Sequence, residues 1–197
     1  MESDITMTVG DAASMLTVAL GSVALAKSGR PTLEAVRVHV VDGHLTFATT
    51  NSFVLTVATA TAGVDADLDV LIPRDAAKAI VKTLSAHKAG IVRFTADRAE
   101  VLTDAGTGST SFTPVGGTFP DYAQLIPPLQ TENGTGSRFA VSPSYLGSMA
   151  ALATKAKAVH LRVQAGESPS QPIRFDYKTD AFSVITVIMP MFATWEG

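Results

Sequence analysis

The 197-residue chain contains no cysteine, which excludes disulfides, thiolate metal sites and a cysteine nucleophile. Only 17% of its residues are charged, and a net charge of −3 gives no overall preference for nucleic acid, although a local basic patch is compatible with it. The N-terminal stretch has no basic residue before Lys27, so it is unlike a signal peptide, and no apolar run is long enough to span a bilayer. With 46% apolar residues, we expect a soluble, cytoplasmic protein with a substantial core.

The residue types that usually carry catalysis or metal binding are not grouped as a site. The four histidines have no carboxylate at triad or ligand spacing, and His39 lies in an alternating strand, where a structural role fits. Asp65, Asp67 and Asp69 would share one face of an extended segment, which suits a hard cation, although a solvated strand entry explains them more simply. The sequence therefore predicts a protein that is not an enzyme, with no catalytic residue, metal or cofactor.

Three units of similar pattern follow one another along the chain. Helices are predicted over 12–24 (with Asp11 as N-cap), from 74 to about 87, and over 145–157. Each helix follows a short strand, and an apolar-Arg-apolar strand centred on Arg37, Arg93 or Arg162 comes after it. Residues 45–60 are predicted as one strand-like run. Because the order βαβββ recurs, we predict an α+β fold built from three repeats.

A proline-rich stretch separates the second repeat from the third. Within residues 119–127, prolines near both ends restrict the backbone to extended conformations, so we predict a stiff, extended linker and no helix. Polar, glycine-rich residues after it predict a loop. The resulting division is a two-repeat domain over 1–116, a linker and loop over 117–137, and a half domain over 138–197.

Positive charge is concentrated on the second helix. Arg74, Lys78 and Lys82 stand at spacing i, i+4, i+8 and therefore share one helix face. Further cations follow at Lys88, Lys155 and Lys157. This pattern fits a solvated helix surface, and it also fits a surface that contacts the phosphate backbone of DNA without reading the sequence. The first helix has no basic residue, which argues against a uniformly basic surface.

The C-terminal stretch 187–192 is strongly apolar and contains two methionines. It predicts either a buried final strand or an adaptable binding surface. Because Pro190 cannot donate a hydrogen bond inside a sheet, we expect the strand to end there, which leaves Met191 and Phe192 available for contacts.

Several short motifs occur in order along the chain: Arg-Pro-Thr-Leu at 30–33 leading to Asp-Gly-x-Leu at 42–45, Leu-Ile-Pro-Arg at 71–74, Phe-Pro-Asp-Tyr at 119–122 with Leu-Ile-Pro at 125–127, and Val-Ile-Met-Pro-Met at 187–191. Together they resemble the bacterial DNA polymerase III β sliding clamp family over nearly the whole chain. The resemblance implies a DNA clamp fold, in which helices line the DNA hole of a ring and antiparallel sheets lie outside. It also implies a processivity factor of DNA replication that binds double-stranded DNA without sequence specificity.

The resemblance further implies a pocket for peptides of DNA polymerases and clamp loaders. Its walls would come from the linker, the first repeat and the C-terminal strand: Leu33, Thr49, Val54, Pro120, Leu125, Val187, Ile188, Met189, Pro190 and Met191. The basic residues named above would face the DNA. Residues 48–54 lack the family's Asp, Gly and Arg, and Gln124 replaces a linker arginine, so we expect a different peptide preference.

The chain has three repeats, whereas a member of the family has six. Because a single βαβββ unit leaves a sheet edge and a helix face uncovered, we expect self-association, with the third repeats of two chains pairing. A closed ring of twelve repeats would then need four chains. Two functions remain open: an oligomeric sliding clamp that encircles DNA, and a non-encircling peptide-binding adaptor, decoy or inhibitor.

Overall fold

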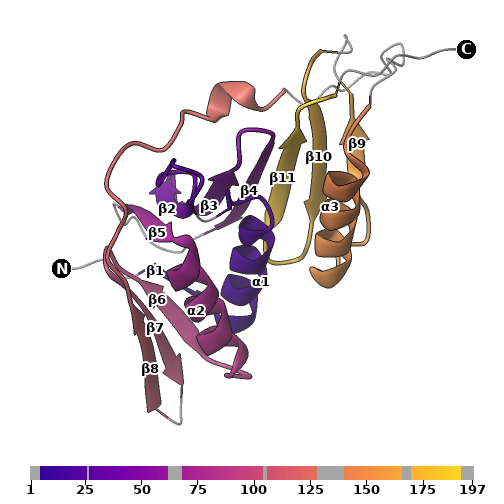
Figure 1. The fold of residues 1–197 in the computed structure, drawn as a ribbon. Coiled ribbons are helices and arrows are strands. Elements are labelled where there is room, and N and C mark those ends of the chain that lie inside the picture. The colour runs from indigo at the N-terminus through magenta and orange to yellow at the C-terminus, as the bar shows by residue number, and fades with distance from the viewer. Residues whose placement is uncertain are drawn as a thin grey trace, which may run out of the picture.

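A computed structural model describes residues 5–25, 27–61, 68–103, 106–127, 140–165 and 170–191 (Figure 1). Its elements are, in chain order, β1 (Ile5–Thr8), α1 (Val9–Leu20), β2 (Ala35–Val41), β3 (His44–Thr50), β4 (Val54–Thr61), β5 (Asp69–Pro73), α2 (Arg74–Ser85), β6 (Ile91–Phe94), β7 (Arg98–Thr103), β8 (Gly106–Ser111), the 3-10 turn η1 (Ala123–Leu125), α3 (Pro143–Lys155), β9 (Arg162–Gln164), β10 (Ile173–Lys178) and β11 (Ser183–Ile188). The strand predicted before the third helix lies largely outside the described residues, and Ala140 from it forms a bridge with Met191.

Two antiparallel sheets form the frame of the molecule. The smaller has the strand order β1-β6-β7-β8, and the larger has the order β5-β2-β3-β4-β11-β10-β9. The first two repeats exchange their leading strands, because β1 pairs with β6 while β5 pairs with β2. Of the described elements, helices α1, α2 and α3 lie on the same side of the sheets (Figure 1). The α+β class and the antiparallel arrangement predicted from the sequence are therefore confirmed.

The third repeat extends the large sheet. Strand β11 pairs with β4 over six positions, from Ser183 opposite Thr59 to Ile188 opposite Val54. The sheet thus joins the predicted two-repeat domain directly to the predicted half domain. The division into 1–116, 117–137 and 138–197 stays a prediction.

The start of α1 differs from the predicted one because another residue caps the helix. The hydroxyl oxygen of Thr8 accepts the backbone N–H of Asp11 at 3.1 Å, so Thr8 is the N-cap of α1 and the predicted Asp11 cap is wrong. Asp11 instead lies in the first turn, where a carboxylate also suits the positive end of the helix dipole. None of the described helices is long and apolar enough to cross a membrane.

The main core lies between the helices and the sheets. Met15 and Leu16 of α1 and Ile80 and Leu84 of α2 are at most 1% exposed. These residues stand at helical spacing, so each helix turns one apolar side toward the sheets. Phe47 of β3 belongs to the same cluster, which joins the first two repeats into one packed unit.

Candidate functional site

The linker crosses the face of the large sheet that lies opposite to the helices. Phe119 is buried there in a cluster with Ala35, Ala48, Leu55, Val57, Leu71 and Val187, and Tyr122 and Ile126 pack at its border. The linker is not extended throughout, because the Asp121 carboxylate accepts the N–H of Ala123 at 3.2 Å and the 3-10 turn η1 forms. The prediction of a continuously extended linker is therefore wrong at this point.

Tyr122 ties the linker to strand β2. Its hydroxyl lies 2.8 Å from His39 Nε2, and its ring meets the Phe119 ring edge-on with centroids 6.1 Å apart. Burial raises the pKa of Tyr122 and lowers the pKa of His39, and the nearby Arg37 adds to the lowering for His39. Both side chains are therefore neutral near pH 7. The structural role predicted for His39 is confirmed by this buried contact.

Arg37 and Asp69 join β2 to β5 on the same face. Arg37 Nε donates to Asp69 Oδ1 at 2.9 Å and Nη2 donates to Oδ2 at 2.7 Å. These hydrogen bonds hold the pKa of the Asp69 carboxyl below its usual value. Asp69 thus serves an ion pair, while Asp65 and Asp67 lie outside the described residues. Among the residues that the structure describes, no three acidic or histidine side chains are grouped to hold a metal ion.

The turn between β3 and β4 meets the end of β11. Asn51 Oδ1 accepts the backbone N–H of Phe53 at 3.0 Å, which closes the turn. Two further hydrogen bonds fix the chain that follows β11: the Met189 N–H donates to the Phe53 carbonyl at 2.9 Å, and the Met191 N–H donates to the Ala140 carbonyl at 2.7 Å. Both methionines therefore stand on a backbone that is held at two points.

Large apolar side chains are exposed around this junction. We call them the linker-end surface: Phe53 (60% exposed), Leu125 (50%), Met189 (42%) and Met191 (57%). Arg174 Nη1 donates to the Pro127 carbonyl at 2.8 Å, and Arg174 pairs with Val187 of β11. The linker thus ends beside the strand whose end carries the two methionines. Large apolar side chains that are exposed on neighbouring segments are typical of interaction sites.

The residues predicted for the peptide pocket fall into an exposed and an interior group. Pro120, Leu125, Met189 and Met191 are exposed, Pro190 is half-buried, and Leu33, Thr49, Val54, Val187 and Ile188 are buried. Val54 and Ile188 pack in a core beneath α3, whereas Val187 faces the linker on the other side of the sheet. Thr49 donates its hydroxyl to the Ala19 carbonyl at 2.6 Å, under α1. The interior group supports the surface from within, and the pocket as a whole stays a prediction.

Sequence patterns do not single out Phe53, although it is the most exposed member of the linker-end surface. Residues 45–60 read as one strand-like run, but the structure turns at Asn51 and divides the run into β3 and β4. The available signal was the Asn51-Ser52 pair, which is a turn-forming dipeptide. Ser52 accordingly adopts a φ of 77°.

Basic side chains lie on the helix-bearing side of the molecule. Of those predicted to face DNA, Arg74 is half-buried at the start of α2, and the others are exposed: Lys78, Lys82, Lys88, Lys155 and Lys157. Lys78 lies 3.9 Å from Asp75, an exposed pair that contributes little to stability. Helix α1 lies between α2 and α3 in Figure 1 and has no cationic residue. Cations therefore flank a middle helix whose charged residue is Asp11, and a DNA-facing role for them stays a prediction.

Comparison with known proteins identifies the fold. No family model and no curated protein matches the sequence. The structure matches the DNA polymerase sliding clamp from Pseudomonas aeruginosa with a TM-score of 0.74 at 14% identity, over 96% of this chain and 67% of that one. It matches the Caulobacter crescentus β sliding clamp with a TM-score of 0.74 at 14% identity, over 98% and 66%. For DNA polymerase III subunit β from Borrelia burgdorferi the TM-score is 0.71 at 13% identity, over 96% and 64%.

The chain thus spans about two-thirds of the length of the clamps that it matches. At this level of identity the likeness concerns the fold. It agrees with the βαβββ repeats and with the motifs that the sequence shares with clamps. Nearly the whole chain has the fold of a bacterial DNA polymerase III β sliding clamp.

Proposed function

We propose that the protein is a non-catalytic, cytoplasmic, sliding-clamp-like processivity factor of DNA replication, which binds peptides of DNA polymerase and clamp-loader type partners. The observation that carries this proposal is the linker-end surface on a clamp fold. The fold extends over 96% of the chain, and large apolar side chains are exposed on the linker (Leu125), on the β3–β4 turn (Phe53) and after β11 (Met189 and Met191).

The chemistry of the linker-end surface suits a short apolar peptide. Phe53, Leu125, Met189 and Met191 offer an aromatic ring, a branched chain and two unbranched thioethers, and none of them is charged. Methionine adapts its shape to different apolar partners. The hydrogen bonds of Met189 and Met191 keep the backbone in place while their side chains adapt, so the surface combines a fixed frame with adjustable contacts.

Griselimycin is a suitable first probe for this surface, because the sliding clamps of Bartonella birtlesii and Pseudomonas aeruginosa have been solved with it bound. Isothermal titration should detect binding to the wild type, and Met191→Asp should weaken it at least about tenfold by placing a charge in an apolar contact. Ile91→Asp is the matched control, since Ile91 is 48% exposed on β6 and outside the linker-end surface. Equal binding by Met191→Asp and the wild type would contradict the placement of the site.

The DNA-binding part of the proposal concerns the helix side. Exposed Lys78 and Lys82 on α2, and Lys155 and Lys157 at the end of α3, would contact phosphates of double-stranded DNA from inside an oligomeric ring. Each lysine–phosphate contact steepens the salt dependence of the logarithm of the binding constant by about 0.9. The double variant Lys78→Glu/Lys82→Glu should therefore bind DNA more weakly and with a shallower salt dependence.

Lys178→Glu is the control for charge alone, because Lys178 is exposed at the end of β10, away from the helices. The decisive comparison is retention on circular and linear plasmid during gel filtration. A ring that encircles DNA stays on the circle and leaves the linear form at its ends. Equal retention on both forms would exclude encirclement.

The alternative is a non-encircling adaptor, decoy or inhibitor that only binds peptides. Helix α1 favours it, because this middle helix carries the Asp11 carboxylate and no basic residue, whereas a ring surface for DNA would gain from cations there. Griselimycin binding without selective retention on circular DNA would support this alternative over the clamp.

A further inference from the structure

One flank of the third repeat is exposed to solvent, whereas the equivalent flanks of the first two repeats are buried. The helices begin at Val9, Arg74 and Pro143, so counting from these starts makes Ala12, Ala77 and Leu146 equivalent. Ala12 and Ala77 are both 0% exposed, whereas Leu146 is 42% exposed. The larger and more apolar side chain is therefore the one left in solvent.

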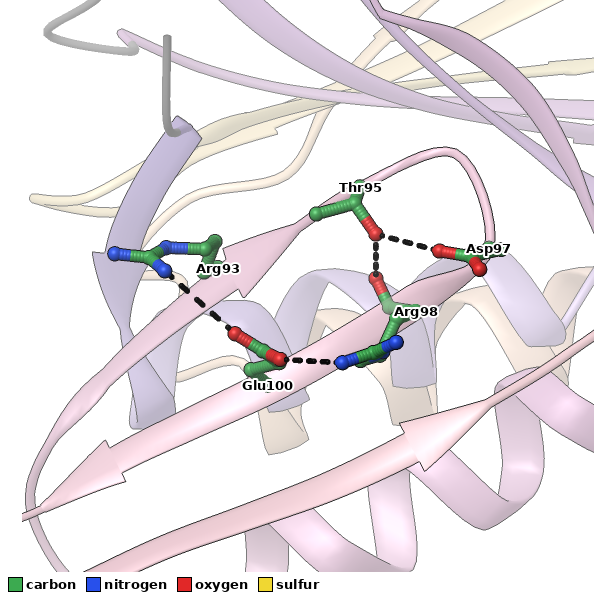
Figure 2. Close-up of polar contacts among 5 residues, drawn as sticks. All are labelled: Arg93, Thr95, Asp97, Arg98 and Glu100. Atoms are coloured by element: carbon green, nitrogen blue, oxygen red, sulfur yellow. Dashed lines mark hydrogen bonds and ion pairs between the residues drawn. The ribbon is translucent and has the colours of Figure 1, made fainter. Parts of the chain in front are cut away.

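A group of three charged side chains occurs in both the second and the third repeat, and it shows which strand positions are equivalent. Figure 2 shows Glu100 of β7 between two arginines, Arg93 of β6 and Arg98 of β7. The third repeat has the same arrangement on β9 and β10. The distances are 3.7 and 3.0 Å in Arg93–Glu100–Arg98, and 3.8 and 3.4 Å in Arg162–Asp176–Arg174. Arg93 and Arg162 also stand directly opposite the carboxylate residue in their sheets, so they occupy equivalent positions.

The residue after the strand arginine is buried in the first two repeats and exposed in the third. Phe94 follows Arg93 and is 3% exposed, and Val38 follows Arg37 in the first repeat and is 0% exposed. Val163 follows Arg162 and is 50% exposed. Val163 stands opposite Phe175, which is buried in the core beneath α3, so Val163 lies on the helix side of the sheet. At this second equivalent position too, the side chain is buried in the first and second repeats and exposed in the third.

The packing between the first two repeats explains why these positions are buried there. There α1 lies against α2, and the exchanged strands β1 and β5 continue the sheets beyond β6 and β2. In the third repeat, α1 lies on one flank of α3, where Leu152 of α3 comes close to Gly21. Leu146 and Ala150 lie on the opposite flank, and β9 is the end strand of its sheet in the part of the chain that is described. In Figure 1, α3 and strand β9 lie on the right-hand side of the ribbon.

We propose that this flank, formed by Leu146 and Ala150 of α3 and Val163 of β9, binds the same flank of a second copy of the chain. Two third repeats would then form one composite domain of two repeats. A second copy is the fitting occupant because the exchange between the first two repeats is reciprocal, each giving a strand to the other. Such an arrangement is two-fold, and a two-fold interface is the one that identical chains can form with themselves.

The composition of the flank supports this occupant. The residues of α3 on that side, Leu146, Gly147, Ala150 and Thr154, are uncharged, so two copies meet without like-charge repulsion. Glycine and alanine also allow close approach of two helices. The interface differs from the linker-end surface and does not depend on DNA or peptide binding.

Sedimentation velocity of the 197-residue chain at several micromolar concentrations tests the proposal. The expected mass is twice the 20.5 kDa of one chain, or a multiple of that dimer. Leu146→Asp and Val163→Asp should each shift the population toward single chains, and Ile91→Asp should not, because Ile91 lies in the second repeat. Both target side chains are partly exposed in the single chain, so the variants should fold, and unchanged far-UV circular dichroism would verify this.

A wild type that sediments as a single chain at all these concentrations would overturn the proposal. An assembly that both Leu146→Asp and Val163→Asp leave unchanged would also overturn it, since the copies would then meet elsewhere. A single-chain protein that still binds griselimycin would contradict this interface alone and leave the proposed peptide site intact.

Discussion

Phe119 anchors the linker, and truncating it gives a quantitative test of how the linker is held. The side chain is 5% exposed, packs in the apolar cluster on the outer face of the large sheet, and meets Tyr122 edge-on. Replacing a buried phenylalanine by alanine costs about 3–5 kcal/mol. Within the described part of the chain, the linker is what covers this cluster, so the site can partly collapse after truncation and we expect a loss at the lower end of this range. The predicted loss for Phe119→Ala is about 3 kcal/mol, of which about 1 kcal/mol comes from the aromatic pair.

Urea unfolding followed by far-UV circular dichroism measures this loss. The protein concentration must be the same for all variants, because self-association changes the apparent stability. Gln124→Ala is the control, since Gln124 is exposed on the same linker and its truncation should change the unfolding free energy by less than about 0.5 kcal/mol. A loss below about 1 kcal/mol for Phe119→Ala would refute the view that this side chain holds the linker on the sheet.

Three other outcomes test individual side chains. Thr49→Val should lower the unfolding free energy by about 1 kcal/mol, because it removes the hydroxyl that bonds the Ala19 carbonyl, and should leave griselimycin binding unchanged; weaker binding would place Thr49 in the site. The wild type should lose stability as the pH falls below about 6.5, because the pKa of His39 is lowered in the folded state and the unfolded chain takes up the proton first. Thermal melts should show a smaller loss for His39→Gln, and an equal loss would assign the effect to another group. Arg37→Gln should raise the pKa of Asp69 toward its ordinary value, as followed by NMR of the carboxyl carbon; an unchanged pKa would show that Arg37 is not its cause.

Much of the fold follows from local sequence patterns. The βαβββ order, the helix side that carries Ile80 and Leu84, and the structural role of His39 all arise from residue spacing within single elements. The motif resemblance led to the clamp fold, which the structure confirms. Errors occur where two residues compete for one local role. Thr8 and Asp11 are both good caps, and only the backbone geometry shows that the threonine hydroxyl accepts the N–H.

The sequence by itself determined the repeats, their helices and the clamp fold, because these depend on spacings of a few residues and on short motifs. Only the tertiary structure decided which partner covers each face. Alternation predicts that Val187 and Ile188 point to opposite sides, but α3 and the linker decide what each one meets. Such contacts join distant segments: the hydroxyls of Thr56 and Thr186, 130 residues apart, lie 3.3 Å from each other. The exposure of Leu146 likewise depends on whether another repeat packs beside α3, which no local pattern encodes.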